Sequence, residues 1–173
     1  MLLKILGAMA VVAGCAGLGF YIAAKEGFRI RELLEFKKSL LILASEIEYK
    51  KNPLNTACEN IANRTEGIVA KLYENYSVLL AESQGETAYR LWMLALENMQ
   101  KKSFYTAEDI AVFDSFGKTL GYLDKPMQLN AINYSINCID EKVAALQAAG
   151  DKNKRMYRSL GAIAGLLIIV LLW

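Results

Sequence analysis

The sequence predicts an all-α protein, in which a six-helix cytoplasmic bundle is flanked by one transmembrane helix at each end. Three observations support this fold class. Two runs without a charged side chain, residues 5–24 and 159–173, lie near the ends of the 173-residue chain. The chain has only two prolines and no alternating run of β-branched residues. Between the two runs, apolar residues recur every three or four positions, the spacing of one helix face.

The first uncharged run, Ile5 to Ala24, has the length of a membrane span. Twenty helical residues rise about 30 Å, the thickness of a bilayer's hydrocarbon core. Two alternatives are a signal peptide, because Lys4 precedes the run, and a lipoprotein anchor, because residues 12–15 (VAGC) resemble the recognition box of bacterial lipoproteins. A lipid-anchored chain would continue into a polar tether, whereas residues 16–24 are apolar. We therefore interpret Cys15 as a small residue inside the span.

The second uncharged run, Ser159 to Trp173, is shorter and reaches only about 23 Å as a helix. Arg155 and Arg158 could extend it by reaching toward headgroups, and Tyr157 and Trp173 suit the two interfaces. We predict a second span. The alternative is a buried helix or a hairpin that does not cross.

Basic residues flank the middle of the chain on both sides. Lys/Arg enrichment marks cytoplasmic flanks, which predicts two spans with both termini outside and a cytoplasmic centre. The predicted domains are residues 1–24, 25–158 and 159–173. Residues 32–151 carry 12 Lys and Arg against 17 Asp and Glu, a net charge of −5, which argues against nucleic-acid binding. The predicted membrane-surface contacts are Arg29, Arg31, Arg155 and Arg158.

Turn signals divide the middle region into six helices. The first continues from the membrane and ends near Asn52, because the residue before a proline is pushed out of the helical region. Pro53 suits the start of a second helix, and Thr65 suits the cap of a third. The third ends at residues 83–85 (SQG), and the fourth runs from about residue 86 to 100.

The last two helices have clearer start signals. Thr106 and Asp109 form a capping-box pattern for the fifth helix, which ends at Gly121. Asp124 opens a long sixth helix that Gly150 is expected to weaken. The predicted core is Ile30, Leu33, Leu34, Leu40, Leu41, Ala44, Ile47, Leu54, Ala57, Cys58, Ile61, Ala62, Ile68, Val69, Leu72, Tyr73, Tyr76, Leu80, Ala88, Leu91, Trp92, Ala95, Met99, Ile110, Phe113, Phe116, Leu120, Ile132, Ile136, Cys138, Ile139, Val143 and Leu146.

The sequence lacks the usual groups of an enzyme. Histidine is absent, which removes the commonest general base and zinc ligand. The three cysteines have no clustered spacing, and residues 116–119 (FGKT) lack the first glycine of a phosphate-binding loop. We predict no catalytic residue, cofactor or metal. The closely spaced acid pairs are interpreted as solvated helix surface: Glu46 and Glu48, Glu108 and Asp109, and Asp140 and Glu141.

Small residues recur in both uncharged runs. Gly161 and Gly165 form a GxxxG, and Gly14 and Gly17 end small-xxx-small pairs with alanine. Such stripes let helices approach closely in lipid, so these glycines are candidates for packing between the spans or against partner spans. The alternative is that they reflect the ordinary composition of membrane helices.

The order of these features resembles the stage III sporulation protein AB family. The resemblance covers nearly the whole chain and is carried by residues 6–8 (LGA), the turn from Glu46 and Tyr49 to residues 53–54 (PL), residues 116–121 (FGKTLG), Asp124 with Gln128, and residues 159–161 (SLG). Residues 36–62 also look like the helical repeat of the F-type inner-membrane proteins of type II secretion and type IV pili, in which an amphipathic helix turns at a proline-leucine pair.

The resemblance implies a non-enzymatic role in the complex that links mother cell and forespore. It implies a place in the mother-cell membrane around the forespore and a platform for a secretion-type ATPase. The implied partners are other stage III sporulation membrane proteins, that ATPase and the lipid bilayer, with a homo-oligomer as a further option. The alternative function is a membrane-bound sensor or regulator whose bundle binds a small ligand.

Overall fold

The computed structural model describes the backbone of residues 2–50, 52–82, 85–121 and 124–172, and the side chains of residues 24–49, 52–82, 85–121 and 124–150. Over this backbone the chain is all-helical and contains no strand. Its elements are α1 (Leu2–Ser45), the π-helical turn η1 (Glu46–Lys50), α2 (Leu54–Ala62), α3 (Gly67–Glu82), α4 (Ala88–Gln100), α5 (Ala107–Gly117) and α6 (Lys125–Leu172).

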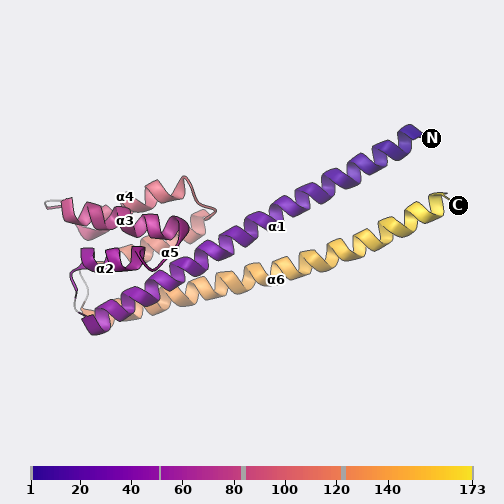
Figure 1. Cartoon of the computed structure of the whole chain (residues 1–173). Helices are drawn as coiled ribbons and strands as arrows, with labels where there is room; N and C mark the ends of the chain where they lie inside the picture. Colours follow the sequence, from indigo (N-terminus) through magenta and orange to yellow (C-terminus); the bar gives the residue numbers. More distant parts are fainter. Residues whose placement is uncertain (1, 51, 83–84, 122–123, 173) are drawn as a thin grey trace.

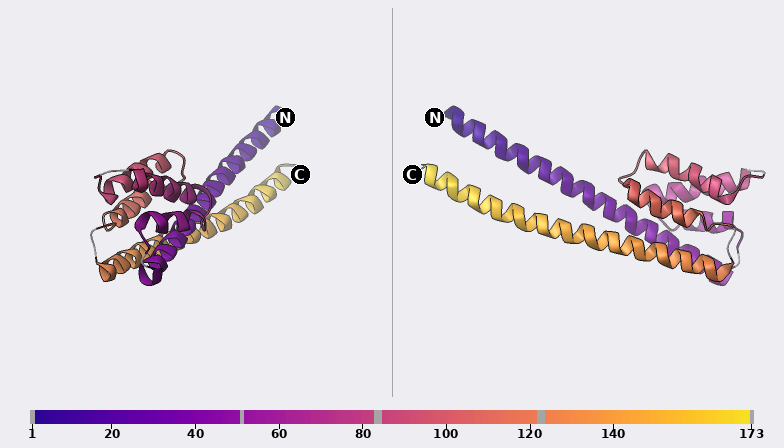
Figure 2. Two further views of the ribbon diagram at one scale, coloured as in Figure 1. Left: turned by 60° about the vertical axis from the view of Figure 1, so that its left-hand side comes forward. Right: turned by 180° about the vertical axis from the view of Figure 1, so that it is seen from behind.

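Two long antiparallel helices, α1 and α6, form the frame of the molecule (Figure 1). Their contacts lie near the closed end, where α1 ends and α6 begins, and both termini lie at the opposite end. The four short helices α2–α5 pack beside this closed end and leave the far halves of α1 and α6 projecting from the bundle (Figure 2). The frame therefore gives the bundle two distinct ends, a closed end and a neck from which the long helices leave.

The first turn of the chain lies at Pro53, where the sequence predicts it. α1 gives way at Ser45 to the π-helical turn, and Pro53, with φ −53° and ψ 150°, precedes α2. Thr65, in contrast, does not cap α3: its buried hydroxyl donates to the carbonyl of Ile61 at 2.9 Å and so closes the end of α2. α3 starts two residues later at Gly67, whose φ of +64° favours glycine.

The starts of α5 and α6 agree with their sequence signals, and α4 starts close to the predicted residue 86. Thr87 accepts from the backbone N–H of Arg90 at 3.3 Å at the start of α4. The capping box of Thr106 and Asp109 is present at α5. Asp124 accepts from the N–H of Met127 at 3.3 Å at the start of α6. α6 runs through Gly150 without a break, and the expected weakening of the helix there stays a prediction.

The core is centred on Trp92, whose side chain is fully buried. Its ring meets those of Phe36, Tyr73, Tyr76 and Phe116 at centroid distances of 5.1–6.3 Å, and the contacts with Tyr76 and Phe116 are edge-on. Most of the predicted core residues are confirmed as buried or packed against the core.

Leu34 and Leu41 are the clear exceptions among the predicted core residues, since they are 43% and 52% exposed. Seven residues apart, they share one edge of α1, whereas the covered face is that of Leu33, Phe36 and Leu40. The apolar stripe of α1 is wider than the face that the other helices cover, so the sequence predicted more buried residues on this helix than the structure has.

The predicted localisation requires correction. None of the helices has, over its described residues, the length and apolarity needed to cross a bilayer. This finding contradicts the prediction of two spans with both termini outside and a cytoplasmic centre in the mother-cell membrane. The physical reason is that the described parts of α1 and α6 are amphipathic, with charged residues between the buried ones.

The two predicted transmembrane segments are also not separate elements. Residues 5–24 belong to α1 and residues 159–173 mostly to α6, and nearly all of their side chains lie outside those described. The helices pass without a break through the boundaries at residues 24/25 and 158/159. The division into three domains stays a prediction.

Candidate functional site

The acid pairs do not all lie on the helix surface. Asp140 and Glu141 are exposed, as are Glu48 and Glu108, but Glu46 is only 3% exposed and Asp109 is fully buried. The interpretation as solvated surface is therefore wrong for Glu46 and Asp109. Each of these two carboxylates sits in a distinct polar cluster, one at the closed end and one at the neck.

The neck cluster is built around the carboxylate of Asp109. Arg29 on α1 donates from Nε to Oδ2 at 2.7 Å and from Nη2 to Oδ1 at 2.9 Å, a bidentate pair. Thr106 donates its backbone N–H to Oδ2 at 2.9 Å, and Lys142 Nζ on α6 lies 3.6 Å from Oδ1. One carboxylate thus caps α5 and ties it to both long helices.

The hydrogen bonds decide the charge state of Asp109. Burial by itself raises the pKa of this carboxyl, but the bonds from Arg29 and Thr106 and the charge of Arg29 outweigh it, so the pKa lies below its ordinary value. The same pair raises the pKa of the Arg29 guanidinium. The group is therefore a fixed structural anion at neutral pH, which does not suit a general acid or base.

The lowered pKa of Asp109 predicts an acid-dependent loss of stability. An unfolded aspartate titrates near pH ~3.9, and the folded pKa is lower. The carboxylate therefore stabilises the fold fully above about pH 4, and this stabilisation is lost as the pH falls through the folded pKa. Denaturant titrations from pH 7 downward should show the gap in unfolding free energy between the native chain and Asp109→Asn closing. A gap that stays constant through the acid range would contradict the assignment.

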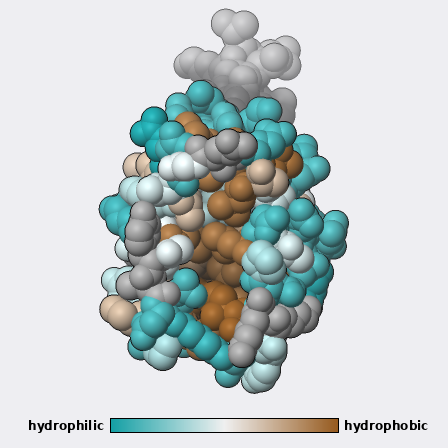
Figure 3. All heavy atoms as spheres, turned by 90° about the vertical axis from the view of Figure 1, so that its left-hand side faces the viewer, coloured by the Kyte–Doolittle hydropathy of each residue, from teal (hydrophilic) through white to brown (hydrophobic). Residues whose placement is uncertain are grey.

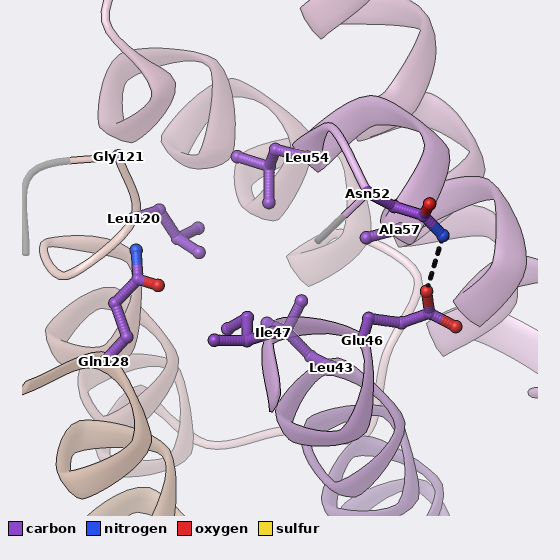
Figure 4. Close-up of a pocket in the computed structure, with 9 residues that line it drawn as sticks. All are labelled: Leu43, Glu46, Ile47, Asn52, Leu54, Ala57, Leu120, Gly121 and Gln128. Carbon is purple, nitrogen blue, oxygen red and sulfur yellow. Dashed lines mark hydrogen bonds between the residues drawn. The ribbon is translucent and has the colours of Figure 1, made fainter. Parts of the chain in front are cut away.

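The second cluster lies in a hollow at the closed end (Figure 4). The hollow has a volume of about 180 Å³ and lies between η1, α2, the turn that follows α5 and the start of α6. Asn52 donates its side-chain N–H to Glu46 Oε2 at 2.9 Å on one wall, and Gln128 forms part of the opposite wall. Figure 3, which faces this end, shows hydrophobic atoms on the floor of a hollow framed by hydrophilic side chains. The apolar lining consists of Leu43, Ile47, Leu54, Ala57 and Leu120.

The hollow suits an anchor side chain better than a free ligand. Small-molecule sites in proteins usually have volumes of roughly 300–1,000 Å³ and enclose most of the ligand. A second groove of about 430 Å³ is lined almost wholly by α4, with Ile110 from α5, so a single helix forms most of its wall. Among the described residues no cluster of side chains could hold a metal ion.

The π-helical turn is the local feature that shapes the hollow. A π turn inserts an extra residue into the helix ladder and frequently lies at a functional site. Here it lies between Ser45 and Pro53 and carries Glu46 and Ile47 into the hollow, while Tyr49 remains 76% exposed. The π turn therefore supplies one wall of the hollow and leaves one aromatic side chain exposed at the closed end.

The predicted surface and packing residues are placed only in part. Arg29 is engaged with Asp109, and Arg31 is exposed and lies 3.9 Å from Glu66. The other predicted residues have side chains outside those described, so their roles stay predictions: Arg155 and Arg158 as surface contacts, and Gly14, Gly17, Gly161 and Gly165 as packing sites.

The two described cysteines do not form a reactive site. Cys58 is buried as predicted, and burial raises the pKa of its thiol to about 12. Cys138 is half-buried on α6. A thiol with so high a pKa is protonated at neutral pH, which makes Cys58 a poor nucleophile.

The burial of the neck and closed-end carboxylates, Asp109 and Glu46, was not predicted, although their spacing from buried apolar residues indicated it. Asp109 precedes the buried Phe113 and Phe116 by four and seven residues, so it lies on the buried face of α5. Glu46, the first residue of η1, follows the buried Leu43 of α1 by three residues. An acidic residue in phase with an apolar stripe was therefore the sign of a buried, partnered group.

Comparison with known proteins identifies one family over nearly the entire length. Residues 4–173 match the family model described as Stage III sporulation protein AB. The chain is 31% identical over 171 residues to Stage III sporulation protein AB of Bacillus subtilis (strain 168), covering 99% of both proteins. It is also similar to a solved structure of Stage III sporulation protein AB, with a TM-score of 0.67 and 25% identity over 72% of this chain and 97% of that one.

Proposed function

The chain belongs to the stage III sporulation protein AB family, which supports a sporulation-related role, and we propose that it acts there as a non-enzymatic assembly platform. The partner in this proposal is the secretion-type ATPase of the complex that links mother cell and forespore, together with other stage III sporulation proteins. The likeness of residues 36–62 to the type II secretion F repeat is the basis for choosing an ATPase.

The observation that carries the proposal is the closed-end hollow. Its lining is mostly apolar, it is too small for most free ligands, and four segments of the chain converge on it. Binding energy at protein interfaces is concentrated in a few anchor side chains that fill such pockets. A leucine-sized or phenylalanine-sized anchor of the partner would fill this hollow, and the side-chain amides of Asn52 and Gln128 would lie on its walls.

The small-ligand sensor is the weaker function. It needs an enclosed cavity, whereas the larger of the two described depressions is bounded mostly by α4.

Replacing Gln128 by arginine is expected to weaken binding of the ATPase by the full-length chain by roughly tenfold or more. The longer charged side chain would cover the hollow with little effect on packing, because Gln128 is only half-buried at the surface of α6. Asn130→Arg is the matched control, since Asn130 is an exposed amide two residues away on another face of the same helix. Co-purification and titration of the two proteins measure the effect. Equal affinities for both variants would refute this site, and no affinity for the native chain would refute the ATPase as partner.

A further inference from the structure

α4 has one face in the core and the opposite face in solvent. Leu91, Ala95 and Met99 are buried, whereas Met93 and Leu94 are 39% and 44% exposed. Both exposed side chains line the second groove, in which α4 forms most of the wall. A methionine and a leucine side by side on an open helix surface suit a contact with another protein, because burying them there removes apolar surface from water.

Charged side chains continue this face to both ends of α4. Residues three or four positions apart lie on one side of a helix, and the charged residues follow that spacing from the two apolar ones. Arg90 Nε lies 3.0 Å from Glu86 Oε2, and Lys101 Nζ lies 3.7 Å from Glu97 Oε1. Both ion pairs are exposed and contribute little to the stability of a single chain. We define the outer face of α4 as Glu86, Arg90, Met93, Leu94, Glu97 and Lys101.

The order of the residues on the outer face is symmetric. From its start the face reads acid, base and apolar residue, and it then reads apolar residue, acid and base. The spacings are four, three, one, three and four residues, so they are symmetric about the midpoint between Met93 and Leu94. When the face is turned end for end, every acid therefore takes the position of a base, and every base takes that of an acid.

A twofold axis through this midpoint would pair the outer face with its own copy. Twofold contacts use the same patch on both chains. In an antiparallel pair of α4 helices, Glu86 faces Lys101 of the second copy. Arg90 faces Glu97 of the second copy, and the apolar residues meet at the centre. A parallel twofold pair would instead set each charge against the same charge of the second copy, which is repulsive.

From this symmetry we propose that the outer face of α4 binds the same face of a second copy in an antiparallel, twofold dimer. The chain itself supplies the complementary order of charges, which is the reason for choosing a second copy over a different protein. A contact between two helices is smaller than the roughly 1,200–2,000 Å² that stable protein interfaces bury. The dimer is therefore weak and forms at high local concentration.

The proposed dimer contact is separate from the closed-end hollow. None of the residues that line the hollow belongs to α4. α4 packs on α3 and α5, and Figure 1 shows it at the edge of the bundle away from α6. The dimer contact therefore does not depend on the proposed ATPase, and either contact can be lost without the other.

Zero-length cross-linking of the full-length chain tests the proposal. A carbodiimide joins a lysine amine directly to a carboxylate in contact with it, and mass spectrometry identifies the joined peptides. A Lys101–Glu86 product can form only between two chains, because these residues are fifteen positions and roughly 22 Å apart along one α4. This product is expected at low salt and at a chain concentration of roughly 0.1–1 mM. Its absence there, while the Lys101–Glu97 product within each chain forms, would overturn the proposal.

Charge reversals test the pairing of the two copies. Arg90→Glu alone and Glu97→Arg alone each set like charges against each other in the dimer, so each should lower the Lys101–Glu86 yield roughly tenfold or more. An equal mixture of the two variants should restore the yield, because one chain then carries only acids at these two positions and the other only bases. A mixture that stays as low as each variant alone would show that the antiparallel pairing is wrong.

Lys38→Glu is the matched control for these reversals. Lys38 is exposed on α1 and forms an intrahelical pair with Glu35 at 3.5 Å, and its reversal changes the net charge by the same amount as Arg90→Glu. The Lys101–Glu86 yield should therefore stay at the level of the native chain. A fall equal to that of Arg90→Glu would show a response to net charge alone and would contradict the proposal.

Discussion

Replacing Gly117 by alanine is expected to destabilise the fold by about 3 kcal/mol, at the upper end of the cost of overpacking a core. A Cβ at this position would collide with the indole ring of Trp92. The ring cannot move aside easily, because it is fully buried and its Nε1 donates to the carbonyl of Phe113 at 2.9 Å. The greater helix propensity of alanine offsets only about 0.5–1 kcal/mol of this cost.

Gly150→Ala is the matched control for this prediction. Gly150 also lies within a helix, but nothing lies within 4 Å of a Cβ added there. This change should leave stability the same or raise it by up to about 1 kcal/mol. Thermal unfolding of the full-length chain measures both variants, and a loss of about 3 kcal/mol corresponds to roughly 6–12 °C for a chain of this size. If Gly117→Ala were as stable as Gly150→Ala, the close packing of α5 on Trp92 would be wrong.

The helical core could be predicted from the sequence because its signals are local. The spacing of Leu91, Ala95 and Met99 determines the buried face of α4, and the box at Thr106 and Asp109 determines the start of α5. Pro53 likewise marks the turn after α1. Each signal acts within one or two helical turns, so no knowledge of the packing was needed.

The neck and closed-end clusters depend on packing and could not be predicted in the same way. The partners Arg29 and Asp109 are separated by 80 residues, and no spacing rule connects them. Arg29 was assigned to a membrane surface because basic residues flank an uncharged run, whereas the structure pairs its guanidinium with Asp109. The uncharged runs near the two ends of the chain also led to the prediction of two separate spans. In the structure these residues belong to the continuous helices α1 and α6.

Removing the arginine of the neck cluster is expected to destabilise the fold by about 3 kcal/mol. Arg29→Ala leaves the fully buried carboxylate of Asp109 without its bidentate partner, and breaking a buried ion pair costs about 3–5 kcal/mol. Lys142, 3.6 Å from Asp109, would compensate in part, which favours the lower end of this range. Denaturant unfolding of the full-length chain, monitored by the fluorescence of the tryptophans, measures the change.

Lys37→Ala provides the matched control, because it also removes a cation of α1 from an acid far along the sequence. Lys37 Nζ lies 2.7 Å from Asp140 Oδ1, which is the same length as the Arg29–Asp109 contact. The difference is burial: Asp140 is 46% exposed, whereas Asp109 is fully buried. Water therefore solvates Asp140 when its partner is lost, and Lys37→Ala should cost less than about 1 kcal/mol. If the two variants lost equal unfolding free energy, distance alone and not burial would determine how much each ion pair stabilises the fold. The neck cluster would then have no special role in joining α5 to the two long helices.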